Sequence, residues 1–151
     1  MMRSSSAVCF IVLCAIIIST TSQAKSIIKT PLSSHQNEKT CSYTVRIVTS
    51  CNSVAYTRDQ IHLSFGDGYG TQVYAQGLDD PSTRTFERCS EDTFEIYGPC
   101  TEDICYIDFY RSGYDGWLPQ NVEIYGENMR PVSFEINDWI PGDMWYGVNY
   151  C

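Results

Sequence analysis

The sequence predicts an all-β domain, a β-sandwich of two antiparallel sheets, and three observations support this prediction. Apolar and polar residues alternate in six stretches beyond residue 41, whereas no window shows the 3.6-residue apolar spacing of an amphipathic helix. Short segments rich in Gly, Pro, Asp and Asn separate these stretches, as turns do between strands. Six cysteines follow the apolar N-terminus, an even number that suits three disulfides.

The N-terminus predicts a secretory signal peptide over residues 1–24. Arg3 precedes the apolar run Ala7–Ile18, and the small residues Ser22 and Ala24 follow it in the pattern of a cleavage site. The run is shorter than the roughly 20 residues of a membrane-spanning helix, so we expect cleavage and export rather than a signal anchor. The expected localisation is therefore extracellular. Residues 25–40 are polar and lack periodicity, which predicts a flexible arm.

The expected strands lie in the domain 41–151 and have one buried and one solvent-facing side. Their buried positions are Tyr43, Val45 and Ile47; Ile61, Leu63 and Phe65; Phe94 and Ile96; Ile107 and Phe109; Val122 and Ile124; and Val132, Phe134 and Ile136. With the turns between them, they predict about eight short antiparallel strands packed as two sheets.

Strand geometry limits how the cysteines pair. If the first strand is extended, Cys41 and Cys51 are about 30 Å apart, far beyond the roughly 7 Å that separates the Cα atoms of a disulfide. The short segment between Cys100 and Cys105 suits a hairpin connection. If the first and last strands pair, Cys41 meets Cys151. We therefore expect the disulfides Cys41–Cys151, Cys51–Cys89 and Cys100–Cys105.

Charge excludes one class of partner. The chain has 18 acidic and 10 basic residues, a formal net charge of −8, and removal of Arg3 with the signal peptide would make it −9. Such a surface repels phosphate backbones, so we expect no nucleic acid partner. No second apolar stretch approaches spanning length, so no transmembrane segment is expected after signal cleavage.

The sequence gives little support for an enzyme, and we expect no catalytic residues. Its histidines are His35, in the expected arm, and His62, on the polar side of an expected strand. A Gly-x-Ser-x-Gly elbow is missing from the sequence, so a serine hydrolase would lack its usual turn. Cysteines held in disulfides cannot serve as thiolate nucleophiles or as zinc ligands.

Several stretches together carry a family resemblance. They are Tyr56–Asp59, Phe65–Asp67, Arg84–Cys89, Gly98–Cys100, Tyr110–Trp117 and Trp145–Cys151, with a looser pattern at Asp92–Ile96, at Trp117 before Val122–Ile124, and at Phe134 before Trp139. The domain 41–151 resembles the plant embryo-specific protein 3 family, whose single domain belongs to the PLAT (lipoxygenase-homology) superfamily. The resemblance implies an eight-stranded sandwich of two four-stranded sheets that contacts protein or lipid. The family name suggests a role in seed or embryo development.

The resemblance also raises calcium as a candidate cofactor, and no other cofactor is expected. Some PLAT domains hold Ca²⁺ through loop carboxylates at one end of the sandwich. The candidate ligands here are Asp67, Asp79, Asp80, Glu91 and Asp92. The alternative is that these acids are solvated loop residues that keep an acidic protein soluble.

Tyrosines form the second candidate site. Tyr106 and Tyr110 occupy the face opposite Ile107 and Phe109, and Tyr69 and Tyr114 lie in Gly-rich loops. Such rings suit a surface that recognises protein or sugar, although cross-strand packing on a solvated sheet face also uses tyrosine. Trp117, which matches a family position that leads a strand, is expected in the core, as are Trp139 and Trp145.

The sequence thus predicts a secreted, non-enzymatic binding module with an extracellular protein as partner. Two alternatives remain open at this point. One is lipid or membrane-surface binding through loop tips, and the other is carbohydrate binding on the tyrosine-rich face.

Overall fold

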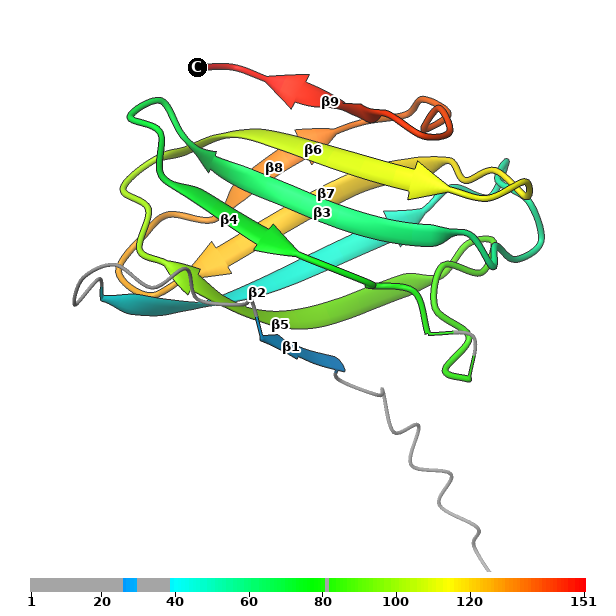
Figure 1. Ribbon diagram of the computed structural model, residues 1–151, viewed down its shortest axis with the longest axis horizontal. Helices are drawn as coiled ribbons and strands as arrows, with labels where there is room; N and C mark the ends of the chain where they lie inside the picture. Colours follow the sequence, from blue (N-terminus) through cyan, green and yellow to red (C-terminus); the bar gives the residue numbers. More distant parts are fainter. Residues whose placement is uncertain (1–25, 30–38, 81) are drawn as a thin grey trace, which may run out of the picture.

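The computed structural model, which describes residues 26–29, 39–80 and 82–151, packs two β-sheets face to face (Figure 1). One sheet has the strand order β1-β5-β2-β7-β8 and the other the order β4-β3-β6-β9. The strands are β1 (Ser26–Lys29), β2 (Thr40–Thr49), β3 (Gln60–Asp67), β4 (Gln72–Ala75), β5 (Glu91–Pro99), β6 (Ile104–Ser112), β7 (Pro119–Gly126), β8 (Val132–Glu135) and β9 (Trp145–Asn149). Strands β2–β9 form two four-stranded antiparallel sheets, as predicted, and the described residues contain no helix.

The ninth strand, β1, lies where the sequence predicted a flexible arm. It pairs in parallel with β5 at the edge of the first sheet, with Ser26 opposite Phe94 and Lys29 opposite Tyr97. The prediction of an unstructured arm is therefore wrong for these four residues. A strand this short has too few residues to show an alternation, and its stability depends on an edge that β5 supplies. The rest of the expected arm up to residue 38, and the expected signal peptide, lie outside the described residues.

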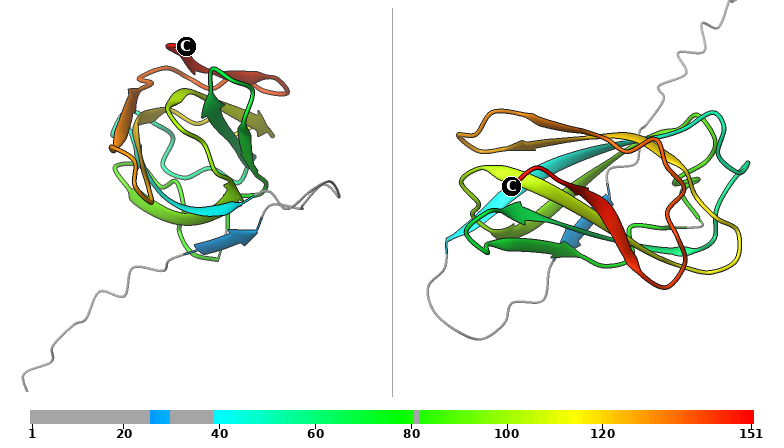
Figure 2. Two further views of the ribbon diagram at one scale, coloured as in Figure 1. Left: turned by 90° about the vertical axis from the view of Figure 1, so that its left-hand side faces the viewer. Right: turned by 90° about the horizontal axis from the view of Figure 1, so that it is seen from above.

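The core lies between the two sheets and contains the alternating positions that the sequence predicted, except that Val132 and Ile136 are only partly buried. Tyr43, Val45 and Ile47 of β2 face Ile61, Leu63 and Phe65 of β3, and all six are at most 1% exposed. The sheets are seen edge-on in Figure 2, with the interior between them. Trp117, just before β7, fills the centre: its ring packs against Phe86 and Phe109, and its Nε1–H donates to Thr49 Oγ1 at 3.1 Å. The expectation that Trp117 is buried is confirmed.

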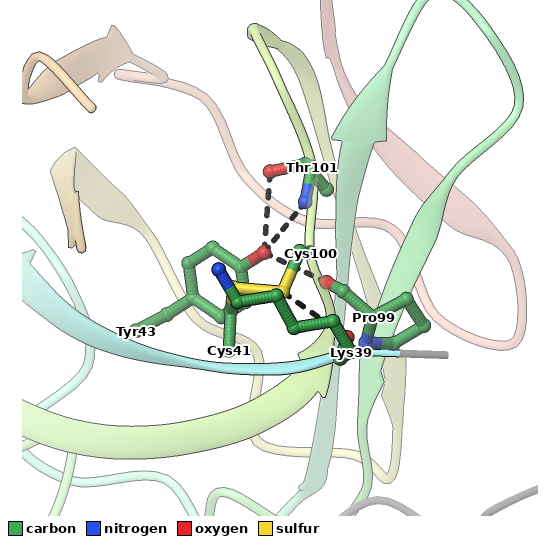
Figure 3. Close-up of a disulfide and its surroundings, with 6 residues drawn as sticks. All are labelled: Lys39, Cys41, Tyr43, Pro99, Cys100 and Thr101. Carbon is green, nitrogen blue, oxygen red and sulfur yellow. Dashed lines mark hydrogen bonds between the residues drawn. A yellow bond between two sulfur atoms is a disulfide. The ribbon is translucent and has the colours of Figure 1, made fainter. Parts of the chain in front are cut away.

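Two disulfides hold the central strand pair β2–β5 at its two ends. Cys41–Cys100 joins the start of β2 to the residue after β5, and Cys51–Cys89 joins the loop after β2 to the loop before β5. Figure 3 shows the first of these with Tyr43, whose hydroxyl donates to the Pro99 carbonyl at 2.7 Å and accepts the Thr101 N–H at 2.8 Å. The same end of β2 is thus fixed by a covalent bond and by a buried hydroxyl.

The third disulfide, Cys105–Cys151, joins the start of β6 to the last residue. Of the predicted pairs, Cys51–Cys89 is the one that the structure contains, whereas Cys41–Cys151 and Cys100–Cys105 are wrong. The error arose from pairing the first and last strands: β2 lies inside one sheet and β9 at the edge of the other. The antiparallel partner of β9 is β6, and the Tyr150 N–H donates to the Cys105 carbonyl at 2.8 Å.

Candidate functional site

The outer side of the β4-β3-β6-β9 sheet carries a row of aromatic rings. Side chains alternate along a strand, so the residues flanking the buried Ile107 and Phe109 of β6 face away from the core. One ring from each of the four strands takes part in this row. We call these residues the aromatic row; they are Tyr74 of β4, His62 of β3, Tyr110 of β6 and Trp145 of β9.

The rings of the aromatic row are in mutual contact. The centroid of His62 lies 6.3 Å from that of Tyr74 and 5.8 Å from that of Tyr110, and the centroid of Trp145 lies 5.6 Å from that of Tyr110. Tyr74 and Trp145 stand on the two edge strands, yet their centroids are only 5.7 Å apart, so both side chains lean over the two middle strands. Trp145 is 44% exposed, so much of its indole is open to solvent.

Asp108 lies beside the aromatic row, between Tyr106 and Tyr110 along β6. Its cross-strand neighbours are Ser64 of β3 and Gly147 of β9. The side chain is partly buried, and this burial raises the pKa of its carboxyl above the ordinary value. Within the described part of the chain, we find no hydrogen bond or ion pair to this carboxylate. A partly buried charge without a donor is unfavourable, which sets Asp108 apart from the other acids described below.

Gly147 determines the space around Asp108. A Cβ at Gly147 would lie 1.9 Å from the carbonyl oxygen of Ile107 and 2.8 Å from Oδ1 of Asp108, so no larger residue fits without a shift of the edge strand. Because glycine has no side chain, the β9 side of the carboxylate is not covered by one. The carboxylate therefore lies against Gly147 of the edge strand, and β9 has no further partner among the described strands.

Tyr106 lies on the other side of Asp108 and packs over Gly66. A Cβ at Gly66 would lie 2.7 Å from the Tyr106 hydroxyl, so the ring rests directly on the β3 backbone. Burial raises the pKa of Tyr106, with the charge of Asp108 adding to the effect, so this phenol keeps its proton at neutral pH. On the outer face, the Asp108 carboxylate therefore lies between the rings of Tyr106 and Tyr110.

The predicted tyrosine surface is only partly assembled by the fold. Tyr106 and Tyr110 share the outer face, as expected from their alternation with core residues. Tyr69, 84% exposed, follows the end of β3, and Tyr114, fully exposed, follows the end of β6. Since β3 and β6 are antiparallel, these two loop tyrosines project from opposite ends of the sandwich. They do not belong to the same surface.

The five candidate calcium ligands are not brought together. Asp67 ends β3 and its Oδ1 accepts the N–H groups of Tyr69 and Thr71, both at 2.9 Å. Asp79 Oδ1 accepts the Ile61 N–H near the start of β3, roughly 20 Å away along an extended strand. The others are also engaged: Asp80 caps the Ser82 N–H, Glu91 pairs with Arg46, and Asp92 accepts the Phe86 N–H.

These acids are instead used to hold loops. Burial would raise the pKa of Asp67, but the N–H donors of Thr71 and Tyr69 outweigh it and hold the pKa below its ordinary value. Among the described residues, no group of three or more His, Cys, Asp or Glu side chains is arranged to hold a metal ion. The carboxylates present therefore do not fit the calcium site that the superfamily implies.

A buried ion pair, which sequence reasoning missed, fixes one end of the sandwich. Asp59 is 3% exposed and pairs with the Arg111 guanidinium, which also donates to the Ile140 carbonyl at 2.8 Å. The Asp59 carboxylate also accepts the N–H groups of Asp115 and Gly116, each at 3.0 Å. Burial alone would raise the pKa of Asp59, but these donors hold it below the ordinary value. The arrangement is structural, because the carboxylate is buried and already accepts from three donors on the protein itself.

The same end of the sandwich exposes apolar loop residues. Tyr56 is 53% exposed, Trp139 48% and Met144 53%, and Tyr114 is fully exposed. Trp139 packs near Gly116, in the loop that Asp59 holds. The expectation that Trp139 and Trp145 lie in the core is wrong: Trp139 lies in a loop and Trp145 on an edge strand, and both are exposed.

Nearby, a hollow of about 220 Å³ lies between Tyr56–Arg58 and the Arg84–Glu87 segment. Arg58 stacks over the Tyr56 ring, 5.1 Å from its centroid, and Arg84 lies within 3.9 Å of Glu87. These cations are thus partnered on the protein itself.

Most members of the aromatic row were also missed as site residues. Alternation placed His62 on the polar side of a strand, but its contact with Tyr74 depends on which strands are neighbours. Nδ1 of His62 accepts the Gly77 N–H at 3.3 Å, so the histidine also holds the backbone after β4. The other histidine, His35, lies outside the described residues.

Where the structure describes the chain, no helix is long and apolar enough to cross a membrane.

Comparisons with known proteins agree on family and fold. The family model described as embryo-specific protein 3 (ATS3) matches residues 27–151. The chain is 61% identical over 112 residues to the Arabidopsis thaliana embryo-specific protein ATS3B, and 57% identical over 116 residues to ATS3A of the same plant. These matches cover 74% and 77% of this chain, but 59% and 65% of the relatives, so the chain spans about two thirds or less of their length.

Among solved structures, coral 8R-lipoxygenase is similar with a TM-score of 0.61 and 24% identity, over 72% of this chain and 17% of the enzyme. The alpha toxin of Clostridium absonum is similar with a TM-score of 0.56 and 22% identity, over 78% of this chain and 33% of the toxin. At this identity the likeness shows the fold, which is that of the PLAT domain and not of the catalytic lipoxygenase domain. With most of its length matched by the family model and its sequence close to two named members, the chain belongs to the embryo-specific protein 3 family.

Proposed function

We propose that this protein is a secreted, non-enzymatic binding module that contacts another protein through the outer face of the β4-β3-β6-β9 sheet. The observation that carries the proposal is the aromatic row, which crosses all four strands and leaves Trp145 44% exposed. Exposed, preordered aromatic rings are enriched where proteins bind each other, because a rigid ring loses little conformational entropy on contact. The names of the relatives support a role in seed or embryo development.

Export is the second part of the proposal. The apolar N-terminal run has the order of a signal peptide, and the three disulfides need an oxidising compartment to form and persist. Expression of the full chain in plant cells, followed by detection of the product in the apoplastic fluid and sequencing of its N-terminus, tests this. Retention of the intact chain inside the cell would overturn it.

The absence of catalysis is the third part. The PLAT domain is not the catalytic part of a lipoxygenase, and His62 is engaged with the Gly77 backbone and with aromatic rings. The purified protein should therefore be inactive on ester, glycoside and peptide substrates. Turnover above the buffer background that one carboxylate substitution abolishes would contradict this part.

The binding surface is tested by capture of extracellular plant proteins on the immobilised domain. We expect wild type to retain a defined protein that Trp145→Ala does not. The matched control is Tyr125→Ala, because Tyr125 is 39% exposed and lies on the opposite sheet. Loss of capture in the control alone, or in neither variant, would exclude the outer face as the binding surface.

A second candidate function rests on the apolar end of the sandwich. Four apolar side chains are exposed there, those of Tyr56, Tyr114, Trp139 and Met144. Exposed aromatic and apolar side chains suit a membrane interface. Co-sedimentation with vesicles of neutral lipid separates the two candidates. Binding that Tyr114→Ala and Trp139→Ala reduce, and Trp145→Ala does not, would favour a lipid surface over a protein partner.

A further inference from the structure

We infer that Asp108 and the aromatic row form a receptor for a cationic side chain, so that the partner presents a Lys- or Arg-bearing segment to this face. The inference rests on the proposed function, because it names the chemistry of the partner at the same surface. Asp108 is a partly buried carboxylate beside aromatic rings, and the described residues place no hydrogen-bond donor on it.

Other acids on the described domain show what a satisfied carboxylate looks like. Asp59 receives two backbone N–H groups and a guanidinium, Asp67 receives two backbone N–H groups, and Glu123 pairs with Arg46 at 2.7 Å. Asp108, on a face already partly covered by rings, has no such donor within the described chain. A partner group that brings a donor and a positive charge would therefore be stabilised here more than at the other acids.

The surroundings of Asp108 favour a cation over a neutral donor. Tyr106 and Tyr110 flank the carboxylate along β6, and Trp145 lies beside Tyr110. Aromatic faces attract ammonium and guanidinium groups, with Trp the strongest of the three ring types. The long apolar stem of Lys or Arg can also lie along exposed ring surface while the charged head reaches the carboxylate.

We place the approach of the partner on the β9 side of the carboxylate. Gly147 puts no side chain over Asp108, and β9 is the edge of its sheet, so an approaching side chain meets no strand beyond it among those described. The net charge of −8 also attracts a basic segment over a longer range than the contact itself. The contact, the edge position and the overall charge therefore favour the same class of partner.

The test uses the purified disulfide-bonded protein and two defined probes, hexa-arginine and cellohexaose, titrated at 150 mM salt with Trp fluorescence and calorimetry as readouts. We expect hexa-arginine to bind the wild-type protein. Asp108→Asn should weaken the affinity by about tenfold or more, as for loss of a charge-assisted contact. Trp145→Ala should weaken the affinity by about threefold or more. Glu127→Gln, an exposed acid in the β7–β8 turn, is the control with the same change of charge, and should alter the affinity less than twofold.

Each other outcome overturns the inference. Equal weakening by Asp108→Asn and Glu127→Gln would mean that the peptide senses only net charge. Binding of cellohexaose that Trp145→Ala abolishes and Asp108→Asn leaves intact would assign the face to a neutral sugar.

Protein capture separates this inference from the proposed function. If wild type captures a protein that Trp145→Ala loses and Asp108→Asn retains, the face binds protein and the cationic contact is wrong. Thermal unfolding of both variants shows whether either has lost its fold, and Trp145→Phe, which keeps a ring, provides a milder second variant.

Discussion

Breaking the Cys105–Cys151 disulfide should strongly destabilise the protein, and the loop that it closes sets the size of the effect. The two cysteines are 46 residues apart. In the chain-entropy model, closure of a loop of this length stabilises the folded state by about 4 kcal/mol relative to the open chain. A domain of this size is typically stable by roughly 5–15 kcal/mol, so the loss is a large part of the total.

The assay is thermal and urea unfolding of a variant in which Cys105 and Cys151 are both replaced by Ser. For a domain of about this length, a loss of about 4 kcal/mol corresponds to a fall in Tm of roughly 15 °C. The native β-rich circular dichroism spectrum should remain below this new midpoint. Since the bond anchors β9, the fluorescence of Trp145 should also shift before that of the buried Trp117.

The matched control is the double Ser variant of Cys51 and Cys89, which opens a loop of 38 residues. The model gives nearly the same destabilisation for it, within about 0.2 kcal/mol. A loss below about 1 kcal/mol for the Cys105 and Cys151 variant would refute the reasoning. So would a difference of more than about 2 kcal/mol between the two variants, because loop length would then not govern the effect.

Three further predictions follow from other groups. Asp59→Asn should cost about 3 kcal/mol at neutral pH, because it leaves Arg111 without its buried counter-charge; since the pKa of Asp59 is lowered, the wild-type advantage should shrink as the pH falls through that pKa, as measured by urea unfolding at several pH values. Asp108→Asn should raise Tm at pH 7, because burial raises the pKa of Asp108 and disfavours its charge. The gain should vanish at a pH where the wild-type carboxyl is protonated. The neighbours Tyr106, Tyr110 and His62 are the same in both proteins, so their titration cancels in the difference between the two Tm values. Alkylation of the secreted protein without reductant should add no label, and a labelled cysteine would contradict the three disulfides.

Much of the fold could be predicted because alternation reports directly on burial. Tyr43, Val45 and Ile47 were expected to face inward and are at most 1% exposed. Alternation says nothing about which strand lies beside which, and this is why two disulfides were mispaired. The neighbours of β2 are β5 and β7, whereas β9 pairs with β6 in the other sheet.

The candidate site was less accessible to sequence reasoning, because it depends on neighbours in space. The outward direction of Tyr106 and Tyr110 follows from their positions between core residues, and it was expected. The position of the Asp108 carboxylate against Gly147, by contrast, was not expected, because Gly147 is 39 positions along the chain but opposite Asp108 in the sheet. Trp145 was expected in the core because it lies in a stretch of family resemblance. Its exposure follows from the position of β9 at a sheet edge.

The placement of the three disulfides has a consequence for how the oxidised chain can come apart. Cys41–Cys100 and Cys51–Cys89 both link the ends of β2 and β5, and Cys105–Cys151 links β6 to the end of the chain beyond β9. None of the three ties a strand of one sheet to a strand of the other. When heat loosens the core of the oxidised protein, the pairs β2–β5 and β6–β9 stay tethered, whereas no disulfide holds one layer against the other. The packing around Trp117 and the loops that cross between the sheets, such as the one that Asp59 holds, then keep the layers in register.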